Sequence, residues 1–444
     1  MKQLEFTLAI EEYLELLKNT QCLNWGQKYY MHWQIEALLF GNAELGSDTV
    51  TKLQYTIYHQ ILHNFMNEFD DLSFIPERNN GLVIVTVQQF LSTNHAPTQA
   101  TLDRAFVLNQ YLGQKVILIN TAEFIGGEKI EILSGRTGNY NDALSKADYI
   151  EYKGVRFPFM QFENTMPNIF NSKEFIQFIK RHKPSYIVNI GSESLLIDTC
   201  SKLVPVLNIS TVASDLTMTE ATASVIGRKY NSSDNQLLSI LGKSVDYLIT
   251  GRFTFSLKEQ THHYTREQLH LPTNRFLLAV VGGRLTDEVT DTFIDMLMPA
   301  LDAGAYLCIV GRMDNYNDFC LRNTIFKTNS TYLGYQKDIL AVLELCDLYV
   351  NPKRKGGGTS VITAMYKGLP TVSLSYGDVA LGAGTEFCVS NYKDMSDIIL
   401  RYMSDSPFYA QMSDKAKARA DYMLDSNTAF AEIIGEFSSR FLQQ

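Results

Sequence analysis

The chain has 444 residues, of which 45% are hydrophobic and 20% charged, values typical of a globular protein with two or three domains. Its formal net charge is −9, and no stripe of lysine and arginine interrupts this acidic balance. These values exclude a protein that binds nucleic acid through general positive charge.

Targeting signals and cysteine motifs give no sign of a membrane or secreted protein. The first residues, MKQLEFTLAIEEYLELL, mix acidic and apolar side chains, unlike a secretory signal peptide. No run reaches the roughly 18 apolar residues of a membrane span. The six cysteines are scattered without a C-x-x-C pair, so we expect reduced thiols and no disulfide framework. The sequence therefore predicts a cytoplasmic protein without a transmembrane segment.

Residues 1–78 have a helical pattern rich in leucine, tyrosine and histidine, with no glycine-rich turn. We expect a helical N-terminal extension that packs on the remainder or binds a partner, and a homo-oligomer formed through these helices is one such arrangement. The histidines here, His32 among them, have no partner in the sequence that resembles a metal ligand.

Residues 79–255 alternate short β-rich runs with amphipathic helical patterns, which predicts a parallel sheet with helices on both faces. Strands are expected at 82–87, 115–120, 185–191, 204–210 and 246–251. We expect this first Rossmann-like domain to bind an acceptor.

A second series of the same kind occupies residues 256–425, after an irregular connection at 252–274. Its strands are expected at 276–283, 305–311, 330–334, 347–352 and 370–375. A break at Asp425-Ser426-Asn427 precedes a final helix within 426–444. The predicted fold class is α/β, with two Rossmann-like domains facing a cleft, and ligands are expected at the carboxyl ends of the strands.

The most informative segment is NPKRKGGGTSVITAMYKGLPTVSL, residues 351–374. Three glycines precede a helix that opens on Thr359 and Ser360, and backbone amides at such a turn can approach an anion closely. Three basic residues at 353–355 add full positive charge. This pattern favours a diphosphate site over the alternative of a flexible connecting loop.

Other loops at predicted strand ends complete a series of motifs. VGGRL contains Arg284, a planar donor suited to phosphate oxygens, and is followed by IVGR, YLGY, DLYVNP, AMYKGLPTVSL and GDV. In this order, over residues 276–390, they resemble the nucleotide-sugar domain of GT-B glycosyltransferases. The N-terminal half resembles that family by its architecture more than by its motifs.

The resemblance divides between two groups of this family. The motif order is similar to that of retaining bacterial polysaccharide transferases, but Lys355 and Thr363 occupy the positions of that group's two glutamates, and Val289 replaces a lysine. The GGGTS turn is more similar to protein O-GlcNAc and asparagine glucosyltransferases, in which hydroxylated residues hold the diphosphate. The resemblance therefore implies a UDP-sugar donor but leaves retention or inversion open.

By this match we expect one group of residues to bind the donor, with Thr363 near the ribose. The group comprises Gly283, Arg284, Tyr335, Lys353, Arg354, Lys355, Gly357, Gly358, Thr359, Ser360 and Thr363.

In the first domain, the loop after residue 87 contains His95, and the resemblance to inverting members implies a general base there. An imidazole that titrates near neutrality suits this role. The alternative is a histidine that orders the loop or holds a substrate, and Asp215 or Glu193 would then be the base. Acceptor and cleft contacts are expected from Asn94, Thr98, Glu193, Thr211 and Asp378.

The resulting prediction is a metal-independent glycosyltransferase with no cofactor, moving glucose or N-acetylglucosamine from a UDP-sugar to a glycan or glycosylated protein. Two alternatives remain: a non-catalytic GT-B-like scaffold in a protein-glycosylation or secretion complex, motivated by the missing glutamates, and a sugar-nucleotide epimerase. The sugar, the acceptor, the linkage and the oligomeric state stay open.

Overall fold

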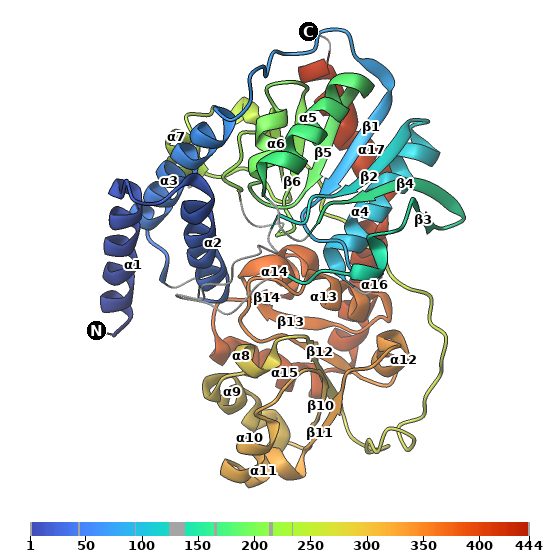
Figure 1. Ribbon diagram of the computed structural model, residues 1–444. Coiled ribbons are helices and arrows are strands. Elements are labelled where there is room, and N and C mark those ends of the chain that lie inside the picture. The colour runs from blue at the N-terminus through green and yellow to red at the C-terminus, as the bar shows by residue number, and fades with distance from the viewer. Residues whose placement is uncertain are drawn as a thin grey trace. The chain divides into compact units, whose positions relative to one another are not determined.

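The computed structural model describes residues 2–42, 45–93, 95–123, 138–163, 167–212, 216–232 and 234–442. The chain forms two compact units, the first made of Met1–Arg252 with Asn427–Gln444 and the second of Phe253–Ser426 (Figure 1). The helices at both ends of the chain thus belong to the first unit, whereas the sequence suggested separate segments at 1–78 and 426–444.

The first unit is built on an eight-stranded sheet in the order β3-β4-β2-β1-β5-β6-β7-β8. All neighbouring strands are parallel except β3 and β4, which form an antiparallel pair. The strands are β1 (Asn79–Val87), β2 (Lys115–Asn120), β3 (Tyr149–Tyr152), β4 (Val155–Gln161), β5 (Pro184–Ile190), β6 (Val206–Ile209), β7 (Ala223–Ile226) and β8 (Leu248–Thr250).

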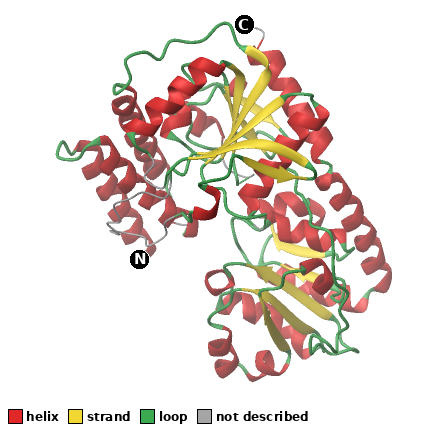
Figure 2. Cartoon of the chain, turned by 45° about the vertical axis from the view of Figure 1, so that its right-hand side comes forward, coloured by secondary structure: helices red, strands yellow, loops and turns green. Residues whose placement is uncertain are grey.

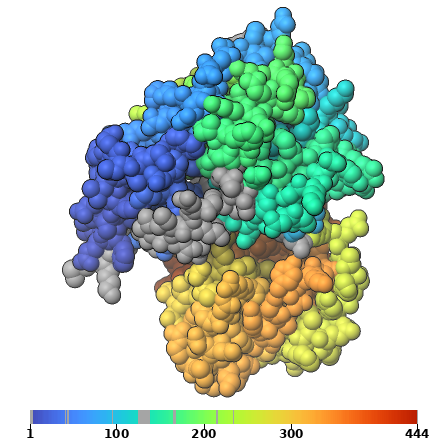
Figure 3. Space-filling model, viewed as in Figure 1, coloured from blue at the N-terminus to red at the C-terminus, as the bar shows by residue number. Residues whose placement is uncertain are grey.

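Three helices of this unit precede the first strand, and the others lie between or after the strands along the chain. The helices are α1 (Lys2–Asn19), α2 (Trp25–Gly41), α3 (Asp48–Met66), α4 (Ala96–Phe106), which continues as a π-helical turn (Val107–Tyr111), α5 (Ile169–His182), α6 (Leu195–Cys200) and α7 (Asp234–Ile240). Short 3₁₀ turns lie at Asp142–Leu144 and Val245–Tyr247. Helices α1–α3 share one apolar core with Leu195 of α6, and they form part of the surface of this unit in Figure 3.

The chain ends on the first unit, although the second unit precedes this end. Helix α17 (Ser426–Phe437) and the π-helical turn after it (Ser438–Leu442) bury Phe430, Ile433 and Phe437 in the core of the first sheet. The ring of Phe437 lies 5.5 Å from that of Tyr186 on β5. These aromatic contacts attach the last helix to the sheet.

The second unit contains a six-stranded sheet in the order β11-β10-β9-β12-β13-β14, with all pairs parallel. Figure 2 shows helices on both sides of these strands. The strands are β9 (Leu277–Gly282), β10 (Tyr306–Gly311), β11 (Ser330–Gly334), β12 (Leu348–Val350), β13 (Thr371–Leu374) and β14 (Cys388–Val389). The helices are α8 (Leu285–Glu288), α9 (Asp291–Asp302), α10 (Tyr316–Arg322), α11 (Thr324–Thr328), α12 (Ile339–Leu343), α13 (Gly358–Tyr366), α14 (Gly377–Ala383), α15 (Tyr392–Ser404) and α16 (Ser406–Leu424), with a 3₁₀ turn at Thr385–Phe387.

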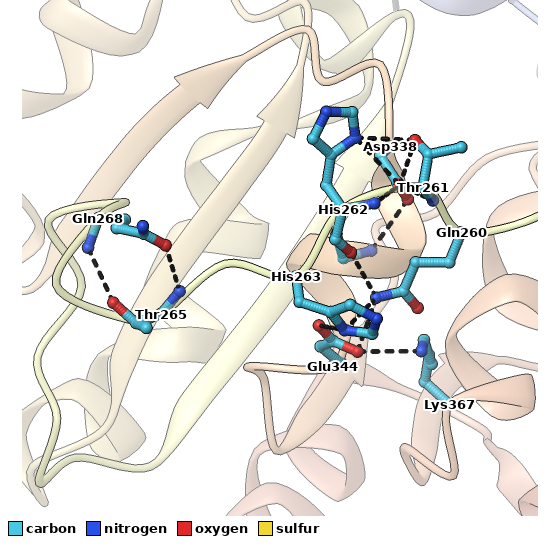
Figure 4. A network of polar contacts seen from close by, with 10 residues as sticks. Gln260, Thr261, His262, His263, Thr265, Gln268, Asp338, Glu344 and Lys367 are labelled. Atoms are coloured by element: carbon cyan, nitrogen blue, oxygen red, sulfur yellow. Dashed lines mark hydrogen bonds and ion pairs between the residues drawn. The ribbon is translucent and has the colours of Figure 1, made fainter.

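The irregular segment that opens the second unit is held by a polar network (Figure 4). The Asp338 carboxylate accepts from the backbone amides of Thr261 and His262, at 2.6 and 2.9 Å. Glu344 lies 2.9 Å from His263 Nδ1 and accepts from Lys367 at 3.1 Å. These histidines are mostly exposed and contact carboxylates of their own unit.

The two parallel sheets predicted from the sequence are confirmed, and each of the ten expected strand segments contains a strand. Three further strands in the first unit, β3, β4 and β7, were missed; β3 and β4 form an antiparallel pair that is only partly buried. The two-residue strand β14 was missed as well. Among the residues described, no helix combines the length and apolar character needed to cross a bilayer.

Candidate functional site

In the second unit, the predicted donor residues gather at the carboxyl ends of neighbouring strands. Gly283 and Arg284 follow β9, the basic and glycine-rich turn follows β12, and Asp378 follows β13. Tyr335 follows β11, and its side chain is 69% exposed. Because parallel strands end at the same edge of a sheet, these loops form one polar edge.

The glycine turn leads directly into α13, as predicted. Gly357 precedes the helix with a φ of 97°, a left-handed conformation that a side chain strains. No side-chain hydrogen bond caps this helix. Its first backbone amides therefore lie at the turn together with the positive end of the helix dipole, an arrangement suited to an anion.

Arg354 lies inside the turn and not on its surface. Its side chain is 3% exposed; Nη1 lies 3.1 Å from Glu288 Oε2, and Nη2 donates to the Tyr349 hydroxyl at 2.7 Å. A Cβ at Gly282 or Gly357 would lie 2.5 or 2.6 Å from the guanidinium. Two of the motif glycines thus make room for Arg354, which organises the turn from within.

Arg284 is the more accessible arginine of the pair. Its side chain is 45% exposed, and Nη2 lies 3.1 Å from Glu288 Oε1. One carboxylate, Glu288, thus contacts both arginines, and an incoming phosphate would compete with it for Arg284. Val289, at the position of the family lysine, is buried and apolar.

The remaining basic residues border the same turn. Lys353 is exposed, with Nζ 5.4 Å from the centre of the Tyr376 ring, and Lys355 is half-buried. The Lys355 carbonyl accepts from the Asp378 amide at 2.7 Å, which joins the glycine turn to the start of α14. Asp378, predicted among the acceptor and cleft contacts, lies in the second unit close to Gly358.

The hydroxyl residues of α13 divide into two kinds. Thr363 is buried, and its hydroxyl donates to the carbonyl of Thr359 at 2.7 Å, so it serves the helix itself. Thr359 and Ser360 lie half-buried in the first turn, beside the helix N-terminus. These two hydroxyls are the ones placed for an anion at the turn.

In the first unit, His95 is the residue before α4, half-buried at the end of the loop after β1. Its Nδ1 lies 3.0 Å from the Thr98 hydroxyl, which accepts from the Leu91 amide at 2.9 Å. The Thr98 hydroxyl either donates to Nδ1 or accepts from it, depending on the tautomer of the ring. Burial lowers the pKa of His95 to about 4, and the ring is neutral near pH 7.

Other predicted acceptor residues follow strands of the same sheet. Glu193 is buried after β5, where its carbonyl accepts from Gln88 Nε2 at 2.5 Å, and Thr211 is exposed after β6. Asn94 and Asp215 lie outside the described residues. The sheet order β1-β5-β6 places the ends of these strands side by side.

A group of buried acids lies beside Glu193. Burial raises the pKa of Glu193 and of Glu123 to about 7, and that of Asp198 to about 6. Glu123 accepts from the Ser194 hydroxyl and from the Leu196 amide. Asp198 accepts from Thr219 and, at 2.5 Å, from Tyr58.

Sequence reasoning missed residues that act through contacts across the fold. Glu288 and Tyr349, which hold Arg354, had no motif to mark them. His32 was expected to have no ligand-like partner, and this was wrong, because Glu36 and Glu193 lie close to it. The spacing of His32 and Glu36, four residues apart on one helix, was the available signal.

Comparison with known proteins agrees with this arrangement. Residues 276–405 match the family of glycosyl transferases group 1. No curated protein matches the chain in sequence.

Several solved structures are similar to the chain over most of its length. A glycosyltransferase from Rickettsia africae is 13% identical with a TM-score of 0.57, covering 82% of this chain and 99% of its own. HepE from Anabaena in complex with UDP is 14% identical with a TM-score of 0.57, covering 80% and 99%. An O-GlcNAc transferase mutant from Thermobaculum terrenum is 13% identical with a TM-score of 0.57, covering 94% of this chain and 83% of its own.

These similarities confirm the predicted GT-B fold. The chain thus has the GT-B fold, and residues 276–405 of its second unit match the family of glycosyl transferases group 1.

Proposed function

We propose that the chain moves glucose or N-acetylglucosamine from a UDP-sugar to a glycan or a glycosylated protein in the cytoplasm. The observation that supports this best is the start of α13: a glycine turn without a side-chain cap, bordered by Arg284, Lys353 and Lys355, at the strand ends of the glycosyltransferase domain. HepE, which shares the fold, is described in complex with UDP, and this favours uridine as the nucleoside.

In this proposal the turn stabilises the leaving UDP. The bond between the anomeric carbon and the diphosphate oxygen breaks, and negative charge develops on that oxygen. Amides at the start of α13 and the side chains of Arg284 and Lys355 are positioned to receive this charge, as fixed donors do in other transfer reactions. Because these groups are themselves cationic or polarised, donor binding needs no metal ion at this turn.

The acceptor is proposed to bind at the strand ends of the first sheet, beside His95. With its proton on Nε2, His95 would donate a hydrogen bond to the acceptor. To take a proton at Nε2, it needs the other tautomer, in which Nδ1–H donates to Thr98. A neutral imidazole whose conjugate acid has a pKa of about 4 is a weak base, so we propose that His95 positions the acceptor hydroxyl.

A second candidate function is a non-catalytic scaffold of a protein-glycosylation complex. Two observations favour it: Lys355 and Thr363 replace the glutamates of the retaining group, and Arg354 is committed to Glu288 and Tyr349 inside the domain. A scaffold would keep the fold and the N-terminal helices as a docking surface, and would need no working donor site.

Calorimetric titration with UDP, GDP, ADP and CMP, with and without EDTA, tests the donor site. The transferase proposal expects micromolar UDP binding that EDTA does not change, followed by UDP release when UDP-glucose or UDP-N-acetylglucosamine is mixed with acceptor glycans. Absence of binding by every nucleotide would overturn it and favour the scaffold.

A further inference from the structure

A cluster of possible metal ligands lies in the first unit, apart from the glycine turn. His32 and Glu36 belong to α2, and Glu193 belongs to the turn between β5 and α6. One ligand atom from each of these three residues lies within 4.8 Å of the other two. Figure 1 shows the two elements, α2 in dark blue and β5 in green.

The imidazole of His32 is arranged as a metal ligand requires. Its side chain is 1% exposed, and its Nε2 lies 3.1 Å from the backbone carbonyl of Gln54 on α3. A carbonyl can only accept, so Nε2 carries the proton and Nδ1 presents a lone pair. Nδ1 is buried and has no hydrogen-bond partner in the part of the chain that the structure describes. Metal-bound histidines commonly donate their other N–H to a carbonyl in this way.

Gln54 also supports the second ligand. Its side-chain amide donates to Glu36 Oε1, while its carbonyl holds His32. A carboxylate has about four lone-pair sites, so it can accept this bond and still coordinate an ion. Gln54 is itself 3% exposed, so one buried residue of α3 orients two neighbouring side chains of α2.

Glu193 is buried together with Glu123 and Asp198. All three carboxylates accept hydrogen bonds from hydroxyl groups, and that of Glu193 does so from Ser192. Among the described residues, Glu193 forms no ion pair with a lysine or arginine, although its side chain is 5% exposed. Burying a carboxylate without a positive partner is costly, and a cation would remove this cost.

We propose that His32, Glu36 and Glu193 bind one divalent transition-metal ion of the zinc type. A neutral imidazole with two carboxylates fits zinc better than magnesium, which favours oxygen ligands alone. Three protein ligands leave a fourth position for water. The Tyr29 hydroxyl, one turn before His32, is buried without a hydrogen-bond partner among the described residues, and Tyr29 interacts electrostatically with Glu193 and Glu36.

The ion would have a structural role that follows from its ligands. It would link α2 to the turn after β5, and so fix the N-terminal helices on the sheet of the first unit. Glu36 is only partly buried, which gives the ion a route from solvent. This inference does not depend on the proposed function, since it involves no residue of the donor turn.

The test is calorimetric titration of the metal-free, untagged full chain with zinc and with cobalt. We expect one ion per chain and a higher melting temperature with zinc. Glu36→Gln and Glu193→Gln should each weaken binding by at least about 10–100-fold, the loss seen when even an outer partner of a ligand is removed. The cobalt spectrum should lack a thiolate charge-transfer band, which separates this site from the six free cysteines.

Glu220→Gln is the matched control, because Glu220 contacts His59 at 2.6 Å in the same unit but lies outside the cluster. It should leave metal affinity unchanged. Circular dichroism and melting without metal show whether each variant is folded. Because Glu36 is partly exposed, its substitution is the one least expected to unfold the chain. Failure to bind one ion, or equal affinity in the Glu36 and Glu193 variants and the native chain, would overturn the proposal.

Discussion

Arg354 and Glu288 form a shielded ion pair, with Nη1 3.1 Å from Oε2 and side chains only 3% and 11% exposed. The pair joins the glycine turn after β12 to the short helix after β9. Arg284 contacts the other oxygen of the same carboxylate. The loop that resembles a phosphate site is therefore shaped by an internal charge pair, and the accessible charge comes from Arg284, Lys353 and Lys355.

Replacing Arg354 should destabilise the second unit. Arg354→Met leaves Glu288 buried without its main partner, and breaking a buried pair in this way costs about 3–5 kcal/mol. Urea unfolding should show the loss, and the double variant with Glu288→Gln should recover part of it. A single variant as stable as the native chain would contradict a structural role for the pair.

Gly357 should be far less tolerant of a side chain than Gly283. At Gly357 a methyl group meets a φ of 97° and Arg354 Nε at 2.6 Å, so Gly357→Ala should cost about 1–3 kcal/mol. At Gly283 nothing lies within 4 Å of an added Cβ, and φ is not in the left-handed region. The Gly283→Ala variant should therefore unfold at nearly the same urea concentration as the native chain. Equal losses of stability in the two variants would argue against close packing of Gly357 on Arg354.

Arg284→Ala tests the proposed donor site directly. If Arg284 pairs with the diphosphate, its removal should weaken UDP binding by about 1.5–3 kcal/mol, the range for charge-assisted hydrogen bonds. Arg401→Ala is the control, because Arg401 also pairs with an acid four residues later, Asp405, in the same unit. If calorimetry finds the same UDP affinity in both variants as in the native chain, Arg284 does not belong to the donor site.

Much of this molecule was predictable because its signals are local. Buried parallel strands such as 115–120 read as short β-rich runs, and glycines before a helix identify the turn at 356–358. The expected place of the ligand loops then follows from the rule that ligands of open parallel sheets bind at the carboxyl ends of the strands. These signals were enough to predict the GT-B fold and the location of the glycine turn.

The roles of single side chains were less predictable, since they depend on partners distant in sequence. In the sequence, Arg354 looks like one of three solvent-facing basic residues. Its ion-pair partner Glu288 is 66 positions away, so the sequence gives no sign that Arg354 is buried. The contact of Asp378 with Gly358, 20 positions earlier, likewise has no sign in the sequence. Of the two acids near His32, Glu193 comes from a different element, the turn after β5.

His95 should titrate far below an ordinary histidine. Burial lowers its pKa to about 4, so the ring should be neutral near pH 7. We expect Nδ1 to accept from the Thr98 hydroxyl, 3.0 Å away, which would place the ring proton on Nε2. Nitrogen-15 NMR of labelled histidine, with His95→Gln for assignment, measures both the pKa and the tautomer. The exposed His263 serves as an internal comparison. A pKa near 6.5 with the proton on Nδ1 would instead support the role of a general base.

Asp198 should make the first unit less stable as the pH rises. Burial raises its pKa to about 6, whereas an unfolded aspartate titrates near about 3.9. Between these values the folded chain retains a proton that the unfolded chain releases, so stability falls from about pH 4 to about pH 6 and stays lower above. Relative to Asp198→Asn, the native chain should lose on the order of 2 kcal/mol of unfolding free energy across this range, measured by urea unfolding with EDTA.

Comparison with Asp234→Asn should give a pH dependence of the opposite sign. Arg228 lowers the pKa of Asp234, and the stability that this pair gives the native chain is lost as the pH falls. Parallel pH profiles for the native chain and Asp198→Asn would show that Asp198 is ionised in the fold.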